Sequence, residues 1–229
     1  MAGLVKNIWI IANWKSNKTI AEALDWVSKV GPKVPKRDDL KVVVCPTFSC
    51  LSEVKKAVTV GNFPFLVGSQ DLSPFSMGAY TGEESASLVK GLVSLSIIGH
   101  SERRENFKEN DEVVSKKAVQ ALENGIIPLV CVQGPDTPVP DGCQLVAYEP
   151  IFAIGTGNPD IPENAGVVAK KLKEKYGTDL EVLYGGSITA ENVKEFLNQD
   201  KISGVLIGNA SLDALEFIKI IKECVGEAN

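Results

Sequence analysis

The sequence predicts a closed (β/α)8 barrel, a fold of the α/β class, on three observations. Short runs rich in Val, Ile and Leu recur along the 229 residues, helical patterns separate them, and the runs are almost continuously apolar. A strand that is apolar on both faces is typical of a parallel sheet covered on both sides. Eight such units favour a closed barrel over a doubly wound sheet, which usually has fewer strands. We expect residues 1–229 to form one domain, because no linker or low-complexity tract interrupts them.

The strands and helices are assigned from these patterns in chain order. Thr19 with Glu22, and Asp160 with Glu163, have the spacing of a capping box, in which two residues at a helix start bond each other's backbone N–H groups. The predicted strands are 8–12, 41–45, 64–68, 93–98, 127–132, 144–148, 181–184 and 204–207. Beyond the two capped helices, helices are predicted at 50–58, 84–91, 111–124, 190–198 and 211–225, with a helical turn after His100.

One connection departs from the alternation. The stretch "QGPDTPVPDGC" (133–143) contains three prolines and two glycines, which exclude a helix of useful length. At about 3.3 Å per residue it still spans about 36 Å, more than the length of a strand, so the parallel topology is preserved. We therefore expect a loop here, with strands that lack a covering helix.

Composition excludes several classes of partner. The chain has 24 Lys and Arg residues and 29 Asp and Glu residues, which gives a net charge of −5. Because the basic residues are also scattered along the chain, neither nucleic acid nor an anionic membrane is an expected partner. Five cysteines without CxxC spacing indicate reduced thiols. The apolar stretch "NIWIIA" is too short for a signal segment or a membrane span, so we expect a cytoplasmic protein.

Polar residues and glycines follow the predicted strands at the end where a barrel carries its active site. Asn13 and Lys15 are two residues apart after the first strand, so both can point to the same side. His100, the only histidine, follows the fourth strand, and Glu149 follows the sixth. Glycine-rich turns follow the last two strands, where backbone N–H groups at helix starts favour an anion. The pattern predicts a carboxylate base, fixed donors and a phosphate-binding cradle on one rim.

At these positions the chain resembles the triosephosphate isomerase family across nearly its whole length. The motifs "NWKSN", "GHSERR", "YEPIFAIGTG", "YGGSI" and "IGNASL" occur in the family's order, each after the expected strand. The resemblance implies interconversion of dihydroxyacetone phosphate and D-glyceraldehyde 3-phosphate through an enediolate, in glycolysis and gluconeogenesis, with no cofactor or metal.

The resemblance also implies roles for individual residues. Glu149 is the base, His100 polarises the substrate carbonyl, and Lys15 offers positive charge to the enediolate. Asn13 orients the substrate, and Glu102 supports Lys15. A glutamate base beside a neutral histidine is a known feature of the family. The local sequence agrees, because the start of a helix opposes a positive charge on His100.

The family's phosphate-binding positions match Gly155, Ser187, Gly208 and Asn209. Asn209 stands where a second glycine is usual, and asparagine tolerates the left-handed backbone that glycine supplies. The segment "PIFAIGTG" resembles the family's mobile lid, which excludes water from the reactive intermediate. Phe152 replaces the lid's usual tryptophan, and residues 158–160 differ from the common far hinge.

Two alternatives compete with this interpretation. An aldolase-like barrel shares a phosphate cradle but needs a Schiff-base lysine inside the barrel, and the only lysine at a motif is Lys15, beside Asn13. A non-catalytic barrel that binds phosphorylated metabolites does not need both His100 and Glu149.

The chain is also expected to bind itself. The loop after the third strand carries Phe75, Met77 and Tyr80, and the segment from Phe75 to Glu83 resembles the family's interdigitating dimer loop. The missing helix after the fifth strand is expected to bare a second apolar surface, with Pro138, Val139 and Pro140 as its only cover. The prediction is at least a homodimer, and a homotetramer if that second surface is used. Beyond Arg103, the run "RRENFKENDE" is expected to be a solvated face, with Arg103 paired to an acidic residue near the rim.

Overall fold

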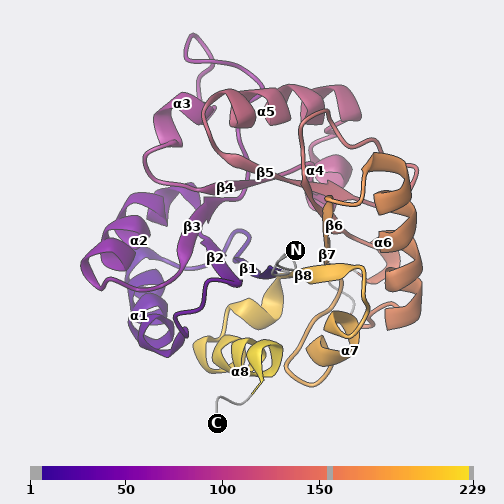
Figure 1. Cartoon of the computed structure of the whole chain (residues 1–229). Coiled ribbons are helices and arrows are strands. Elements are labelled where there is room, and N and C mark those ends of the chain that lie inside the picture. Colours follow the sequence, from indigo (N-terminus) through magenta and orange to yellow (C-terminus); the bar gives the residue numbers. More distant parts are fainter. Residues whose placement is uncertain (1–6, 154–156, 227–229) are drawn as a thin grey trace.

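The computed structural model describes residues 7–153 and 157–226. Within them eight parallel strands lie side by side in chain order, and the last pairs with the first, so the sheet closes into a barrel. Figure 1 looks along the barrel and shows the strands at its centre with the helices around them. The predicted (β/α)8 fold is confirmed.

All eight predicted strands are present, with bounds shifted by at most two residues. The strands are β1 (Ile8–Asn13), β2 (Leu40–Cys45), β3 (Leu66–Ser69), β4 (Leu95–Ile98), β5 (Ile127–Val132), β6 (Leu145–Tyr148), β7 (Glu181–Tyr184) and β8 (Ile202–Ile207). The prediction started the last strand at Gly204, but β8 begins two residues earlier, so Gly204 lies inside the strand. A Cβ at Gly204 would lie 2.1 Å from the carbonyl oxygen of Trp9, and the β7–β8 register shifts at this point. Glycine here permits the close approach of β1.

The helices also follow the predicted order, although several are shorter than expected, most of all α3, α7 and α8. They are α1 (Ile20–Val30), α2 (Phe48–Val60), α3 (Ala86–Val89), α4 (Ser101–Asn106), α5 (Asp111–Glu123), α6 (Pro162–Tyr176), α7 (Val193–Leu197) and α8 (Ala214–Val225). Three 3-10 turns accompany them: η1 (Gly31–Lys33), η2 (Ile151–Ala153) and η3 (Asn209–Ser211).

The two predicted capping boxes have different outcomes. Thr19 caps α1, and Glu22 returns a bond to the backbone N–H of Thr19 (2.8 Å), as expected. The prediction of a capping box at Asp160 is wrong. α6 starts one residue later than that box requires, with Ile161 as its N-cap and Pro162 as its first residue. The Asp160 carboxylate instead accepts the N–H of Ile161 (2.8 Å) and the side-chain amide of Asn164 (3.2 Å).

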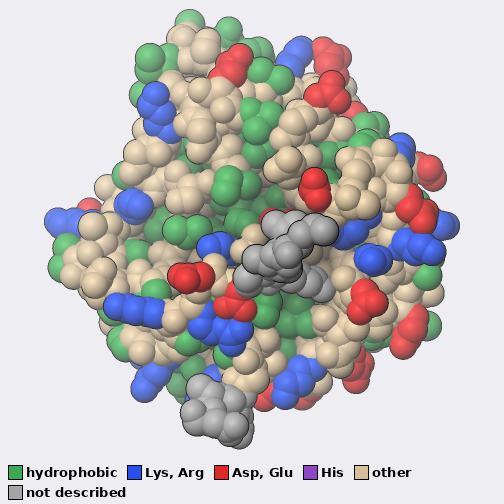
Figure 2. Space-filling view, in the orientation of Figure 1, with side chains coloured by type: hydrophobic (Ala, Val, Ile, Leu, Met, Phe, Trp, Pro, Cys, Tyr) green, Lys and Arg blue, Asp and Glu red, His purple; other side chains and the backbone are tan. Residues whose placement is uncertain are grey.

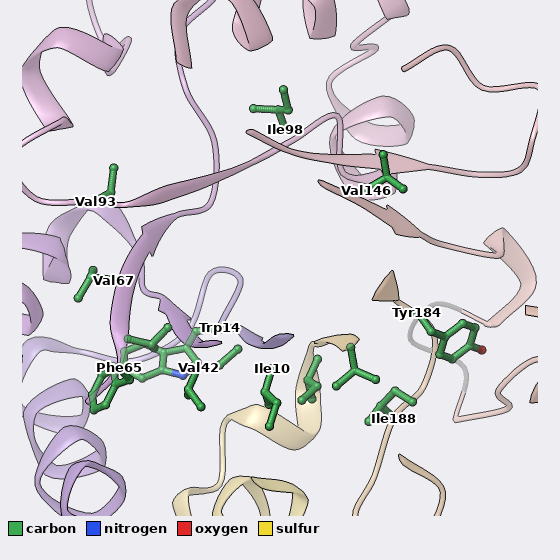
Figure 3. Close-up of a cluster of buried hydrophobic side chains, with 14 of the residues drawn as sticks. Ile10, Trp14, Val42, Phe65, Val67, Val93, Ile98, Val146, Tyr184 and Ile188 are labelled. Carbon is green, nitrogen blue, oxygen red and sulfur yellow. The ribbon is translucent and has the colours of Figure 1, made fainter. Parts of the chain in front are cut away.

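Alternate residues of each strand belong to two separate apolar layers. Inside the barrel, Trp9 and Ile11 of β1 pack with inward residues of the other strands. Outside it, Ile10 and Ala12 pack with residues of the surrounding helices. Figure 3 shows part of this outer layer, including Trp14 and Phe65. The period of two therefore runs through the sheet, except in β8, where Ile202 and Val205 both lie in the outer layer because the register shifts at Gly204.

The connection from β5 to β6 contains only turns over residues 133–144, all of them described, as predicted. It covers the strands better than expected. Val139 and Cys143 are each only 8% exposed, and the outward Val132 and Val146 beneath them are fully buried. The outward residues of β5 and β6 are therefore not bare, contrary to the expectation, although Leu122 of α5, beside Gly142 of the loop, and Ile127 at the start of β5 are each 40% exposed.

The loop between β3 and α3 projects beyond the ring of helices, at the top of Figure 1. Phe75 stacks on Tyr80 with ring centroids 4.2 Å apart, yet both rings stay about two-fifths exposed, and Met77 is 63% exposed. Figure 2 shows hydrophobic side chains gathered at this tip. The predicted apolar loop is confirmed.

Candidate active site

The inward positions of the strands continue into polar residues at the carboxyl rim. Inward Ile11 of β1 is followed two residues later by Asn13, and inward Ala147 of β6 is followed by Glu149. Strand hydrogen bonding continues past β6, because the N–H of Glu149 donates to the carbonyl of Val132 (2.8 Å). The strand period therefore aims Asn13 and Glu149 into the mouth of the barrel.

A cavity of about 170 Å³ opens at this mouth. It collects most of the predicted site: Asn13, Lys15, His100, Glu149, Ser187, Gly208 and Asn209 line it, with Gly157, Gly185, Gly186, Ile188, Thr189, Leu206 and Ala210. Glu102 does not line the cavity but reaches Lys15 from α4. Gly155 lies outside the described residues.

Glu149 is fully buried, and its two oxygens have different surroundings. Oε2 accepts the backbone N–H of Ser101 (2.9 Å). Oε1 lies 3.0 Å from Nε2 of His100, but without the alignment of a hydrogen bond, and it has no hydrogen-bond partner among the described residues. One carboxylate oxygen thus fixes the side chain, while the other keeps its lone pairs for a proton.

His100 is the N-cap of α4, and its Nδ1 accepts the backbone N–H of Glu102 (3.2 Å). A nitrogen that accepts an N–H carries no hydrogen itself, which leaves Nε2 as the ring nitrogen that can donate. Nε2 faces Glu149 at the cavity. The start of a helix after His100 is confirmed, and it acts through one specific N–H group as well as through the helix dipole.

Lys15 is held at both its backbone and its ammonium group. Its φ of +53° is left-handed, which is uncommon for a residue with a side chain. Its N–H donates to Oδ1 of Asn13 (3.0 Å), and its carbonyl accepts from the amide of Gln70 (2.8 Å). Its Nζ forms an ion pair with Oε1 of Glu102. These contacts fix the position of a flexible side chain.

The turns after β7 and β8 close the cavity, although not as predicted. The α7 helix starts only at Val193, so the turn around Ser187 is not a helix start, and the Ser187 hydroxyl donates to the carbonyl of Ala153 (2.7 Å). Asn209 opens the short η3 turn and is not among the described residues with positive φ. Asn209 therefore does not use the left-handed backbone that asparagine tolerates, and its conformation does not require a glycine.

The start of the predicted lid lies next to this cavity. Ile151 and Phe152 form part of the η2 turn and are 70% and 64% exposed. At the far end, the N–H of Asp160 donates to the Tyr184 hydroxyl (2.8 Å). Burial raises the pKa of Tyr184 to about 12, although its bond with the N–H of Asp160 lowers the pKa.

Sequence comparison assigns this arrangement to a family. A sequence profile described as triosephosphate isomerase matches residues 8–143 and 142–224, which together span the barrel. The chain belongs to the triosephosphate isomerase family. It is 39% identical over 245 residues to the triosephosphate isomerase of Alkaliphilus oremlandii, and 38% identical over 238 residues to that of Mesomycoplasma hyopneumoniae strain 7448. Each alignment covers 93% of this chain and 97% of the relative.

A third relative, the triosephosphate isomerase of Thermodesulfovibrio yellowstonii, is 35% identical over 243 residues, covering 93% of this chain and 98% of the relative. Membership of this isomerase family agrees with a cavity that contains a carboxylate, an imidazole and an ammonium group. Among the described residues, no cluster of His, Cys, Asp or Glu has the arrangement of a metal site. No described helix has the length and apolar character needed to cross a membrane.

Three contacts at the site were not predicted from the sequence. Gln70 was missed, because nothing local marks a glutamine that bonds two distant carbonyl groups, those of Lys15 and Cys45 (2.9 Å). The contact of Ser101 could have been anticipated, since the first backbone N–H groups of any helix need an acceptor outside the helix. Cys131 of β5 lies beneath the site, where burial and the Glu149 carboxylate raise the pKa of its thiol.

Proposed function

We propose that this chain interconverts dihydroxyacetone phosphate and D-glyceraldehyde 3-phosphate, in glycolysis and gluconeogenesis, with Glu149 as the base. Glu149 removes a proton from the carbon beside the substrate carbonyl and returns it to the neighbouring carbon. The reaction passes through an enediolate, whose negative oxygens need fixed donors. Nε2–H of His100 supplies one donor, and Nζ of Lys15 supplies positive charge.

The observation that carries this proposal is the pairing of Glu149 and His100. Oε1 of Glu149 and Nε2 of His100 lie 3.0 Å apart at the cavity. The opposite atoms, Oε2 and Nδ1, are occupied by backbone N–H groups of α4. Both side chains therefore present their reactive atoms to the same space, one as an acceptor and one as a donor.

The phosphate group is assigned to the turns after β7 and β8. Ser187, Gly208 and Asn209 line the cavity, and Gly155 is proposed to complete the set. A Cβ on Gly208 would lie 3.5 Å from Nζ of Lys15, so the ammonium lies beside this cradle. Asn13 orients Lys15 as well as the substrate, and Glu102 supports Lys15.

An assay coupled to oxidation of D-glyceraldehyde 3-phosphate tests the proposal. We expect turnover from dihydroxyacetone phosphate in the presence of a chelator, and loss of turnover in His100→Gln. Absence of turnover in the intact protein contradicts it. Trapping with borohydride separates the aldolase-like alternative, because reduction links a substrate covalently only to a Schiff-base lysine.

We also propose that the chain acts in the cytoplasm as a homodimer through the loop from Phe75 to Glu83. The support is the exposed apolar tip formed by Phe75, Met77 and Tyr80. The buried strands under residues 133–144 remove the argument for a tetramer through that surface. Light scattering across a dilution series tests the dimer: an active monomer at every concentration is incompatible with it.

A further inference from the structure

Four charged side chains form a cluster behind the rim, between β3, α4 and α5. Lys117 Nζ donates to both oxygens of Asp71 (2.7 Å each) and to Oε1 of Glu109 (2.5 Å). Nε of Arg103 donates to the same Glu109 oxygen (2.5 Å) and lies 2.9 Å from Oδ2 of Asp71. Two cations are thus shared between two carboxylates. The predicted pairing of Arg103 with an acidic residue is confirmed, and the run after it is mostly exposed as expected, except that the side chain of Glu109 is buried in this cluster.

The cluster is largely shielded from water. The side chains of Lys117 and Glu109 are 3% and 7% exposed, and that of Asp71 is 13% exposed. Only Arg103, at 32%, has substantial contact with solvent. Charge interactions in such a place are weakly screened, and losing one partner is costly.

The cluster joins the two chain segments that hold Lys15. Gln70, which bonds the carbonyl of Lys15, directly precedes Asp71. Glu102, which pairs with the ammonium of Lys15, directly precedes Arg103. The contact between Asp71 and Arg103 therefore connects the holder of the Lys15 backbone to the holder of its charge.

We propose that Asp71 and Arg103 are positioning residues for Lys15, and that they act through Gln70 and Glu102. Lys15 needs such support, because its left-handed backbone is intrinsically unfavourable and persists only when its surroundings fix it. Loss of the Asp71–Arg103 contact lets the two holders move apart, so the ammonium is displaced from the phosphate cradle. This inference rests on the proposed role of Lys15 in binding and catalysis.

The test uses four variants of the full chain. Asp71→Asn and Arg103→Met each remove one charge of the contact, and Arg103→Lys retains a cation at that position. Asp25→Asn is the matched control, because it removes an exposed aspartate from a surface pair with Lys29. Each protein is characterised by kcat and KM, by melting temperature, and by calorimetric titration with inorganic phosphate, which needs no turnover.

A misplacement of about 1 Å at a catalytic group can cost about 100-fold in rate, so we expect kcat to fall by about 10- to 100-fold in Asp71→Asn and Arg103→Met. Inorganic phosphate should bind several-fold more weakly to both, since Nζ of Lys15 lies beside the cradle. Arg103→Lys should recover most of the loss, and Asp25→Asn should match the unmodified protein. In the double variant Asp71→Asn/Arg103→Met, the losses should not multiply, because both changes remove the same contact.

Unchanged kcat and phosphate binding in a folded Asp71→Asn protein overturn the proposal, and so do losses that simply multiply in the double variant. A lower melting temperature without a change in kcat assigns the cluster a structural role only. If Arg103→Met does not fold, Asp71→Asn and Arg103→Lys decide the question. If the unmodified protein shows no turnover, the proposed function fails, while phosphate titration still tests the positioning of Lys15.

Discussion

Glu149 combines complete burial with one oxygen that has no hydrogen-bond partner among the described residues. Burial of a carboxylate is unfavourable unless its charge is compensated, and here only Oε2 accepts a well-aligned hydrogen bond, from Ser101. Oε1 lies 3.0 Å from Nε2 of His100 at the cavity. At the residue scale, the site thus retains a reactive group in a place where folding alone would not favour one.

Shortening this side chain is the first prediction. Glu149→Asp retains the charge but withdraws the carboxylate by one methylene group, so we expect kcat to fall about 100-fold with little change in KM. Steady-state kinetics of the isomerisation measure both. A variant with unchanged kcat would show that Glu149 is not the base.

Gly186 carries a second prediction, because it leaves space for the hydroxyl of Tyr184. A Cβ at Gly186 would lie 2.1 Å from that hydroxyl, and the Tyr184 ring cannot retreat, since it stacks on Phe196 at 3.9 Å. We expect Gly186→Ala to lower the free energy of unfolding by about 1–3 kcal/mol. Gly134→Ala is the matched control, because nothing lies within 4 Å of its added Cβ. Equal urea midpoints for the two variants contradict this account.

Among the predicted site residues that line the cavity, two follow strands directly. Asn13 and Glu149 continue the inward period of β1 and β6, so the strand pattern alone places them. Gln70 and Ser101 act through contacts with residues far away in the chain, and no local pattern reports such contacts. Side chains that continue a strand into the cavity are therefore easier to predict from a sequence than the residues that hold them in place.

At the scale of elements, α5 is notable for burying the ammonium group of Lys117 among carboxylates. Lys117→Met removes the cation that contacts both Asp71 and Glu109 and leaves their charges uncompensated in a shielded site. We expect a loss of about 3–5 kcal/mol in the free energy of unfolding. Lys116→Met is the matched control, because its exposed pair with Glu112 contributes at most about 0.5 kcal/mol. Equal denaturant midpoints for Lys117→Met and Lys116→Met would show that the ion pairs of Lys117 do not stabilise the fold.

The same cluster predicts a dependence of stability on pH. Burial raises the pKa of Asp71 from its ordinary 3.8 to about 6, against the opposing effect of Lys117. The folded protein therefore holds this proton more tightly than the unfolded chain. The resulting stabilisation is complete below the unfolded pKa and is lost as pH rises through about 6.

The melting temperature of the unmodified protein, minus that of Asp71→Asn, should increase as pH falls from 7.5 to 4.5. Calorimetric scans at intervals of half a pH unit measure it. A difference that stays constant over this range contradicts the raised pKa.

The predicted start of α6 was wrong, because a neighbouring residue is better suited to the first helical position. The sequence around Asp160 has the spacing of a capping box, but Pro162 favours the first helical position and moves the helix start. The helices predicted at 84–91 and 190–198 contain only one short helix each, α3 and α7. Elements this short are defined by their packing against the barrel, which apolar periodicity does not show.

At the scale of the whole molecule, most of the barrel follows from repetition. Eight apolar runs with helical patterns between them were sufficient to predict the order, the parallel direction and the closure of the sheet. The projecting loop after β3 was also predictable, since its apolar side chains match no strand or helix pattern. The way in which residues 133–144 cover β5 and β6 was not, because it depends on where Val139 and Cys143 come to lie.

That short connection has a consequence for how the barrel assembles. The entropy lost in closing a loop grows with its length, so bringing β5 and β6 together over residues 133–144 costs less than pairing β6 with β7 across residues 149–180. Contacts between segments close in the chain also form fastest. We expect pulse-labelled hydrogen exchange during refolding to protect the amides of the β5–β6 pair before those of β1 and β8, which close the barrel from opposite ends of the chain. A chain that protects β1 and β8 first would contradict this order, in which the one connection without a helix brings its two strands together early.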